Sequence, residues 1–250
     1  MPNWVKNIVH ISGPEEDVAK AIDFMRDKNP KYEHDIDFNN ILPMPERLNI
    51  VSGGSDRGYV ALYLKTLSVD ERRQLQDELN KRTLGYYGTY SKKYADSFAM
   101  ADGTMDIPEG NLSWMRKHFE RDYSHVKPSS MEDVGKAYID NILEYGHDTW
   151  YEWCIDNWGT KWNACETTIL ENGFEFNTAW STPIPIIEAL SSKFPELTFR
   201  IEWADENLGY NCGTIECANG EIALEEYPND DEAYNFACMI WGYEPDDLED

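Results

Sequence analysis

The sequence predicts an α+β fold in which helices cover a sheet of short strands. Three observations predict this class. A mostly apolar, strand-like run from Trp4 to Ile11 leads directly into a helix start, and two Asn-Gly pairs, at 172–173 and 219–220, each separate two strand-like runs. Between these parts, the apolar residues instead recur at helical spacing. We therefore predict a discontinuous core, residues 1–50 and 148–250, interrupted by a mainly helical insertion, residues 51–147.

The N-terminal part is predicted to form a buried strand and an amphipathic helix. The turn at residues 12–14 places a proline at the helix start, and two glutamates follow in the first turn. Residues 36–40 then alternate apolar and polar side chains, which predicts a short half-buried strand that ends at Pro43. The apolar face of the helix consists of Val18, Ala21, Ile22 and Met25.

The middle of the chain is predicted to be helical. Gly53-Gly54 opens it, and Ser68 with Glu71 forms the capping-box pattern of a helix that reaches about Arg82. The aromatic, glycine-containing segment 86–110 allows no assignment. Further helices are expected at residues 110–122, 131–145 and 148–158.

The C-terminal part is predicted to return to the sheet. Pro183 starts a helix with an apolar stripe, and residues 197–203 alternate as a strand. The occurrence of strand, helix, strand twice along the chain is the split βαβ pattern of a ferredoxin-like sandwich, extended here by a further hairpin. The two Asn-Gly hairpins join residues 165–170 to 174–179 and residues 214–218 to 221–227.

Residues 150–162 concentrate four of the nine tryptophans around one Gly-Thr-Lys turn. A tryptophan buries roughly 150–250 Å² of surface, so a cluster of this kind normally nucleates a core or forms a recognition surface. We predict that Trp153, Trp158 and Trp162 belong to the structural core.

This block is one of several segments that resemble the YubB ferredoxin-like family. The resemblance spans residues 1–48 and 148–217, and it implies a ferredoxin-like fold and a genetic setting on phages and plasmids. It implies no active site, and Val5 stands where the family is expected to carry a cysteine. The other matching segments are MPNWVKN at residues 1–7, SGP at 12–14, FNNILPMPE at 38–46 and TAWSTPIP at 178–185.

Composition predicts a globular cytosolic protein, and the resemblance to a phage- and plasmid-encoded family implies that the cytoplasm is that of the host cell. Hydrophobic residues make up 41% and aromatic residues 13% of the chain, which suffices for a packed core. No run approaches the roughly eighteen apolar residues of a membrane span, and no secretion signal is recognised at the N-terminus. The five cysteines lack Cys-x2-Cys pairs, so we expect reduced, buried thiols and predict neither a metal site nor a cofactor.

Charge is the second strong signal. The chain has 22 basic and 47 acidic residues, a formal net charge of −25, and residues 201–250 contain 15 of the acidic residues but no lysine or arginine. Such a segment must face water, a cation or a basic partner. Direct nucleic-acid binding through this segment is not expected, because phosphate neutralisation requires clustered Lys and Arg.

Two residues of the tryptophan block have both a structural and a functional interpretation. Lys161 lies between Trp158 and Trp162 in the sequence, so it is either a cation–π or ion-pair partner or a contact for an anion or partner group. Cys154 shares a helical face with Trp158, where burial would raise the pKa of the thiol, so packing is expected there. We predict no catalytic residue.

The acidic C-terminal part predicts an interaction protein that binds a basic surface in the manner of a DNA mimic. The phage or plasmid setting that the resemblance implies makes inhibition of a host factor, such as a nucleic-acid-binding defence protein, the expected role. Two alternatives stay open: a metal-assisted hydrolase acting on a nucleotide or nucleic acid, and a small-ligand-binding protein that uses the tryptophan cluster. The predicted partner-binding residues are acidic side chains of the last fifty positions: Glu202, Asp205, Glu206, Glu225, Glu226, Asp230, Asp231, Glu232, Asp246 and Asp247.

Overall fold

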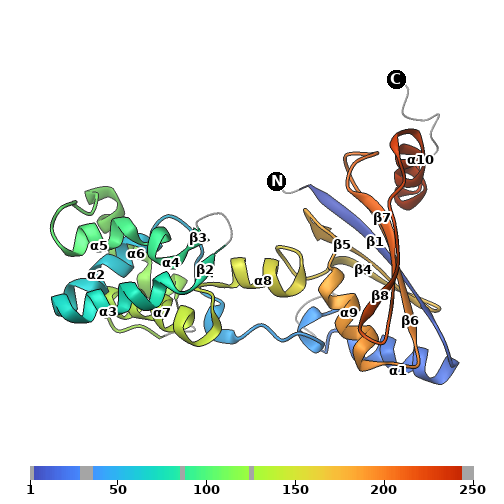
Figure 1. Ribbon diagram of the computed structural model, residues 1–250, viewed down its shortest axis with the longest axis horizontal. Coiled ribbons are helices and arrows are strands. Elements are labelled where there is room, and N and C mark those ends of the chain that lie inside the picture. Colours follow the sequence, from blue (N-terminus) through green and yellow to red (C-terminus); the bar gives the residue numbers. More distant parts are fainter. Residues whose placement is uncertain (1–2, 29–35, 85–87, 124–126, 244–250) are drawn as a thin grey trace. The chain divides into compact units, whose positions relative to one another are not determined.

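The structure is a computed structural model, which describes residues 3–28, 36–84, 88–123 and 127–243 (Figure 1). The chain forms two compact units. Unit 1 contains residues 1–44 and 154–250, and unit 2 contains residues 45–153. The sequence placed the borders a few residues away, at 50/51 and 147/148.

Unit 1 is built on a six-stranded antiparallel sheet with the order β4-β5-β1-β6-β7-β8 (Figure 1). Strands and helices alternate as β1-α1-β4-β5-α9-β6, and the N-terminal strand lies between β5 and β6, which is the arrangement of a ferredoxin-like sandwich. The hairpin β7-β8 extends the sheet beyond β6. The strands are β1 (Trp4–Ser12), β4 (Cys165–Leu170), β5 (Gly173–Ala179), β6 (Thr198–Asp205), β7 (Cys212–Ala218) and β8 (Glu221–Glu226).

Helices cover both faces of this sheet. α1 (Glu15–Met25) and α9 (Ile184–Lys193) share one face, where Phe24 and Phe194 meet edge-on with ring centroids 5.8 Å apart. Side chains alternate along β1, so Val9 is buried under these helices while Ile8 points to the other face. There α10 (Asp230–Trp241) packs its alanines and Ile240 against Ile8 and the end of β6.

Two hairpin turns depend on glycine. Asn219 and Gly220 have φ of 52° and 83°, the left-handed pair that a type I′ turn between β7 and β8 requires. At the other hairpin, a Cβ on Gly173 would lie 1.8 Å from the Val9 carbonyl oxygen, so only glycine lets β5 approach β1 here. The Asn-Gly signals therefore correctly predict both hairpins.

Unit 2 is mainly helical and has its own hydrophobic core. The central helix is α2, which contacts α5, α6 and α7. Gly135 lets α7 approach α2 closely, because a Cβ at that position would lie 2.0 Å from the Tyr59 carbonyl oxygen. The elements are η2 (Glu46–Leu48), α2 (Asp56–Thr66), α3 (Val69–Asn80), β2 (Thr83–Leu84), β3 (Gly88–Thr89), α4 (Tyr90–Lys93), α5 (Ala95–Ala101), α6 (Glu109–Asp122) and α7 (Met131–Tyr145), followed by α8 (Trp150–Trp158), which continues into unit 1.

Three local features differ from the sequence-based expectation. The predicted strand at residues 36–40 is wrong: Ile36 forms one isolated bridge with Arg26, and residues 38–40 form the 3-10 helix η1 (Phe38–Asn40). The reason is that the Asp37 carboxylate accepts the Asn39 backbone N–H and so turns the chain. Helices α2 and α10 were not predicted at all. No described helix has both the length and the apolar character needed to cross a membrane.

Candidate functional site

The turn after α8 attaches the loop that contains η1 to the sheet of unit 1. The Trp158 Nε1–H donates to the Leu42 carbonyl oxygen at 2.8 Å, and its ring lies edge-on to Phe38 at 5.8 Å. Asn163 continues this attachment, because its Oδ1 accepts the Phe38 backbone N–H and its Nδ2 donates to Asp37. The second half of the tryptophan block is therefore a packing element.

The three tryptophans predicted as core residues differ in burial. Trp153, in unit 2, and Trp158, in unit 1, are buried, with 8% and 3% exposure. Trp162 is half-buried and lies 6.0 Å from the Trp4 ring. Trp153 and Trp158 are buried as a packing role requires, whereas Trp162 lies outside the fully buried core.

Lys161 lies between two indole rings. Its Nζ is 4.5 Å from the centroid of Trp162 and 4.5 Å from that of Trp180, within the range of cation–π attraction. Trp180 has a φ of 74°, an uncommon value for a residue with a large side chain, and is 42% exposed. This geometry supports the cation–π interpretation of Lys161 over a contact with an anion.

The thiols have the properties of packing residues. All five cysteines are free. Burial raises the pKa of Cys154 to about 12, and burial also raises the pKa of Cys217, to about 11. A catalytic or redox-active cysteine needs a lowered pKa, so neither thiol is activated as a nucleophile.

Two of the predicted partner-binding residues do not belong to an open acidic surface. Asp205 is 5% exposed, and its carboxylate accepts the Asn207 backbone N–H at 2.8 Å, so it stabilises the turn after β6. This corrects its assignment to the partner-binding face. Glu202 lies 3.0 Å from the Arg200 guanidinium, so its charge already has a partner on the same face of the sheet.

The other predicted acidic residues are either exposed or outside the part of the chain that the structure describes. Glu206, after β6, and Glu232, in α10, are exposed. The run 230–232 begins α10, where acidic residues in general stabilise a helix. The side chains of Asp230 and Asp231, together with residues Asp246 and Asp247, lie outside the described part of the chain.

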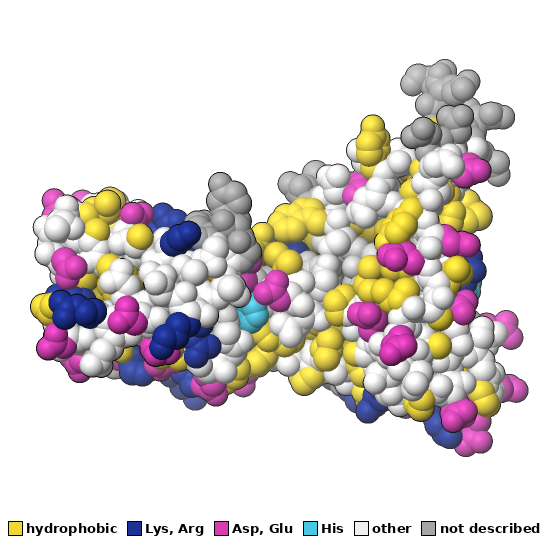
Figure 2. Space-filling view, in the orientation of Figure 1, with side chains coloured by type: hydrophobic (Ala, Val, Ile, Leu, Met, Phe, Trp, Pro, Cys, Tyr) yellow, Lys and Arg dark blue, Asp and Glu magenta, His cyan; other side chains and the backbone are white. Residues whose placement is uncertain are grey.

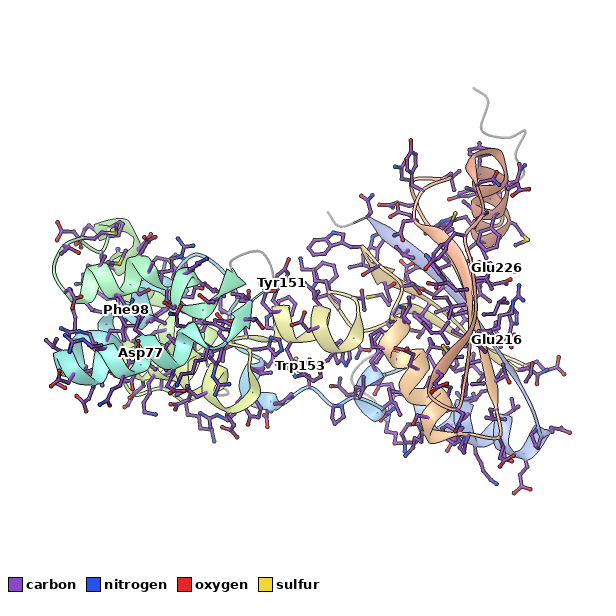
Figure 3. The ribbon with its side chains drawn as sticks, viewed as in Figure 1. Asp77, Phe98, Tyr151, Trp153, Glu216 and Glu226 are labelled. Carbon is purple, nitrogen blue, oxygen red and sulfur yellow. The ribbon has the colours of Figure 1, made fainter. Side chains whose placement is uncertain are left out.

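Strand β8 carries a group of exposed acidic residues. It is an edge strand, and every residue in it except Leu224 is exposed. We call Glu221, Glu225, Glu226 and Tyr227 the β8 edge. Glu226 lies on the same face as Glu216 of β7, and both are labelled in Figure 3. Figure 2 shows acidic side chains interspersed with hydrophobic ones over the visible side of this unit.

A buried charge cluster occupies the interior of unit 2. The Lys93 ammonium donates to Asp148 Oδ2 and lies 3.7 Å from Asp56 Oδ2. The Tyr94 hydroxyl donates to the same Asp148 oxygen at 2.6 Å. Asp148 is fully buried and Asp56 is 6% exposed, so two carboxylates and one ammonium share a site with little access to water. The cluster connects α2, α4 and the segment between α7 and α8.

The charges in this cluster stabilise one another. Burial alone would lower the pKa of Lys93, but Asp148 and Asp56 together raise it above its ordinary value. Burial raises the pKa of Asp56, with Lys93 acting in the opposite direction. Burial, and then the Asp148 charge, hold the pKa of Tyr94 well above its usual range. Lys93 is therefore charged at neutral pH and offsets part of the negative charge of the two buried carboxylates.

Sequence reasoning missed this cluster. Asp56, Lys93 and Asp148 are far apart in the sequence, and Lys93 falls in the segment that allowed no assignment. The available signal was Gly53-Gly54, which marks a loop directly before Asp56. Among the described residues, no group of three or more His, Cys, Asp or Glu side chains is arranged to hold a metal ion.

Comparison with known proteins finds a similarity in the C-terminal region. Residues 157–244 match the model of the family described as "Ferredoxin-like domain in Api92-like protein", so this region is similar to that ferredoxin-like domain. A crystal structure of a protein api92 from Yersinia pseudotuberculosis is 12% identical to this chain, with a TM-score of 0.40 over 91% of this chain and 99% of that one. No curated protein matches the chain.

Proposed function

We propose that the protein binds and inhibits a protein with a basic surface, and that the β8 edge is part of the contact. The observation that carries this proposal is the exposure of three glutamates on an edge strand. Among the described residues, no Lys or Arg nitrogen lies within ion-pair distance of Glu221 or Glu226, and Glu225 accepts its hydrogen bond from Tyr227. These charges are therefore available to attract a cationic surface.

The β8 edge carries fewer charges per unit length than duplex DNA does. Residues 221–226 span roughly 16 Å at a strand rise of about 3.3 Å per residue. Duplex DNA carries about one charge per 1.7 Å, so the same length of DNA holds roughly nine charges against three glutamates here. A mimic of duplex DNA thus needs acidic residues from neighbouring elements, such as Glu206, Glu216 and Glu232. Attraction to a basic protein surface does not require the charge density of duplex DNA, so the β8 edge can contribute to it without those residues.

The same glutamates have a competing structural explanation. Charged side chains on an edge strand prevent it from pairing with the edge strand of another molecule. In that case their removal promotes self-association and leaves binding of other proteins unchanged. The two explanations make opposite predictions for one set of variants.

The finer parts of the proposal are supported by resemblance. Similarity to the YubB ferredoxin-like family supports a phage or plasmid setting, and that setting favours a host nucleic-acid-binding defence protein as the partner, encountered in the host cytoplasm. The hydrolase and aromatic-site alternatives have less support. A hydrolase would need a metal ion at the buried carboxylates, but the Lys93 ammonium lies between Asp56 and Asp148. A ligand of the tryptophan cluster would have to compete with Lys161, which lies between Trp162 and Trp180.

The test uses a charge-neutralising variant and a matched control. The variant combines Glu221→Gln, Glu225→Gln and Glu226→Gln. The control combines Asp77→Asn, Asp106→Asn and Glu109→Gln, which removes the same charge from exposed positions of unit 2. Tagged proteins are used to capture partners from host lysate, and each captured protein is then purified for binding measurements at increasing salt.

We expect the wild type and the control to bind a basic, nucleic-acid-binding protein that added salt and duplex DNA both release. The β8 variant should bind it more slowly and more weakly. Equal, salt-insensitive binding by all three proteins would remove the β8 edge from the interface. Self-association of the β8 variant alone, with partner binding unchanged, would instead assign the glutamates to edge protection.

A further inference from the structure

A small cavity lies beside the buried charge cluster of unit 2. Its volume is about 260 Å³, enough for a side chain or a small organic molecule. The Ser52-Gly53-Gly54 loop forms one wall, and the first turns of α2 and α8 form the others. Tyr151, labelled in Figure 3, contributes an aromatic ring. The charged lining residues are Asp56, Arg57, Lys93 and Glu152.

The lining holds two acids and two bases, and the salt-bridge partners of the two bases add two further carboxylates behind it. The two cations already have anionic partners: Lys93 donates to Asp148, and Arg57 lies 3.1 Å from Asp96. Counting those partners, two cations face four carboxylates. An anion would therefore enter a site whose positive charges are neutralised, whereas a cation would restore the balance.

Asp56 has an oxygen available for a ligand. Its Oδ1 accepts the Arg57 backbone N–H at 2.7 Å. Its Oδ2 lies 3.7 Å from the Lys93 nitrogen, which is an ion pair but too long for a hydrogen bond. Among the described residues no hydrogen-bond donor reaches this Oδ2, so a donor that enters the cavity can bond to an oxygen of a carboxylate that is only 6% exposed.

The loop leaves room for that donor. A Cβ built at Gly53 or Gly54 meets no atom within 4 Å, so the backbone borders open space on this side of the unit. Gly53 also has a φ of 150°, which other residues rarely adopt. Beyond the same two glycines lies a second cavity of about 330 Å³, lined in part by Trp114, which is 38% exposed. A ligand held at Asp56 can thus extend past the loop.

We propose that this cavity binds the ammonium or guanidinium group of a small ligand or of a partner's side chain. Asp56 and Glu152 accept its hydrogen bonds, and the Tyr151 ring offers a cation–π contact. A bare metal ion fits the site less well, because the Lys93 ammonium is adjacent and repels it. An organic cation with a single charge is repelled by Lys93 less than a divalent ion is, and it can donate hydrogen bonds to both carboxylates.

The experiment measures binding of three probes to the full chain by NMR and calorimetry. N-acetyl-arginine methylamide carries one guanidinium and no charged terminus, and N-acetyl-citrulline methylamide is its neutral isostere. Methylguanidinium supplies the head group alone. We expect saturable 1:1 binding of the arginine probe, with the amide shifts centred on residues 52–57 and 151–152, and no saturable binding of the citrulline probe.

Three variants locate the contact. Asp56→Asn should weaken the arginine probe at least about tenfold, the loss expected for one charge-assisted hydrogen bond. Glu152→Gln should weaken it as well, and it lies nearer the surface, so it tests the site even if Asp56→Asn fails to fold. Asp77→Asn, which removes an exposed charge elsewhere in unit 2, should have no effect.

Several results would overturn the proposal. These are unsaturable binding, equal binding of the citrulline probe, or an effect of Asp77→Asn as large as that of Glu152→Gln. Methylguanidinium separates the two sources of the cation: equal affinity assigns the site to a free head group, and weaker affinity assigns it to an arginine side chain. The β8 proposal is unaffected by any of these outcomes, because its residues lie in unit 1.

Discussion

Trp158 offers the most direct test of how unit 1 is held together. Trp158→Ala removes an indole that is 3% exposed, together with its contact to Phe38 and its hydrogen bond to the Leu42 carbonyl oxygen. Replacing a buried large aromatic residue with alanine typically costs about 3–5 kcal/mol. For a domain of this size, that loss corresponds to a fall in the melting temperature of roughly 10–20 °C.

Trp158→Phe separates packing from hydrogen bonding. It keeps most of the buried ring but leaves the Leu42 carbonyl oxygen without its donor, which costs about 1–3 kcal/mol. The melting temperature should therefore fall by clearly less than in Trp158→Ala. Tyr210→Ala is the matched control, because it removes an aromatic ring from the same unit at a position that is 68% exposed. It should shift the melting temperature little.

The assay combines scanning calorimetry with hydrogen exchange. In Trp158→Ala, exchange should accelerate in β1 and β5 of unit 1, while amides of α2 and α7 keep their protection because unit 2 has its own core. A melting temperature for Trp158→Ala within a few degrees of wild type, or a loss of binding without any loss of stability, would refute the packing role of the tryptophan block.

Three further predictions concern local features. Gly135→Ala should lower the free energy of unfolding of unit 2 by about 1–3 kcal/mol, because the added methyl group collides with the Tyr59 carbonyl oxygen. Denaturant unfolding measures this loss, and a variant as stable as the wild type would show that α2 and α7 can move apart without cost. Hydrogen bonds from Ser68 lower the pKa of Glu71 in the folded protein. They therefore stabilise the fold at pH values above the unfolded-state pKa of Glu71, and this stabilisation is lost as the pH falls through the folded-state pKa. Ser68→Ala should move the Glu71 pKa, followed by NMR titration, part of the way back to its ordinary value, because the backbone N–H of residue 68 still donates to the carboxylate; an unchanged pKa would contradict the capping box. Cys154→Ala should keep both the fold and partner binding, because the thiol only packs. In the wild type, burial raises the pKa of Cys154 to about 12, so a thiol reagent at neutral pH should leave it unmodified until the protein unfolds.

Local signals in the sequence were sufficient for most elements of the fold. The Ser68–Glu71 pair marks the start of α3, because both halves of the capping box act within one turn. Asn219-Gly220 marks a hairpin, because its two residues adopt the positive φ values that such a turn needs. Helix α2 escaped prediction because it is surrounded by other helices, so its sequence lacks the contrast between an apolar and a polar face.

The sequence by itself determined the α+β class, the ferredoxin-like order of elements, the helical insertion and the acidic C-terminal part, because these depend on periodicity, turn chemistry and composition. Only the tertiary structure decided which charges are paired. It placed Asp205 inside a turn, left Glu226 exposed on an edge strand, and brought Asp56, Lys93 and Asp148 together. The strength of a charge interaction depends on distance and on exposure to water, and both are set by packing between residues far apart in the chain.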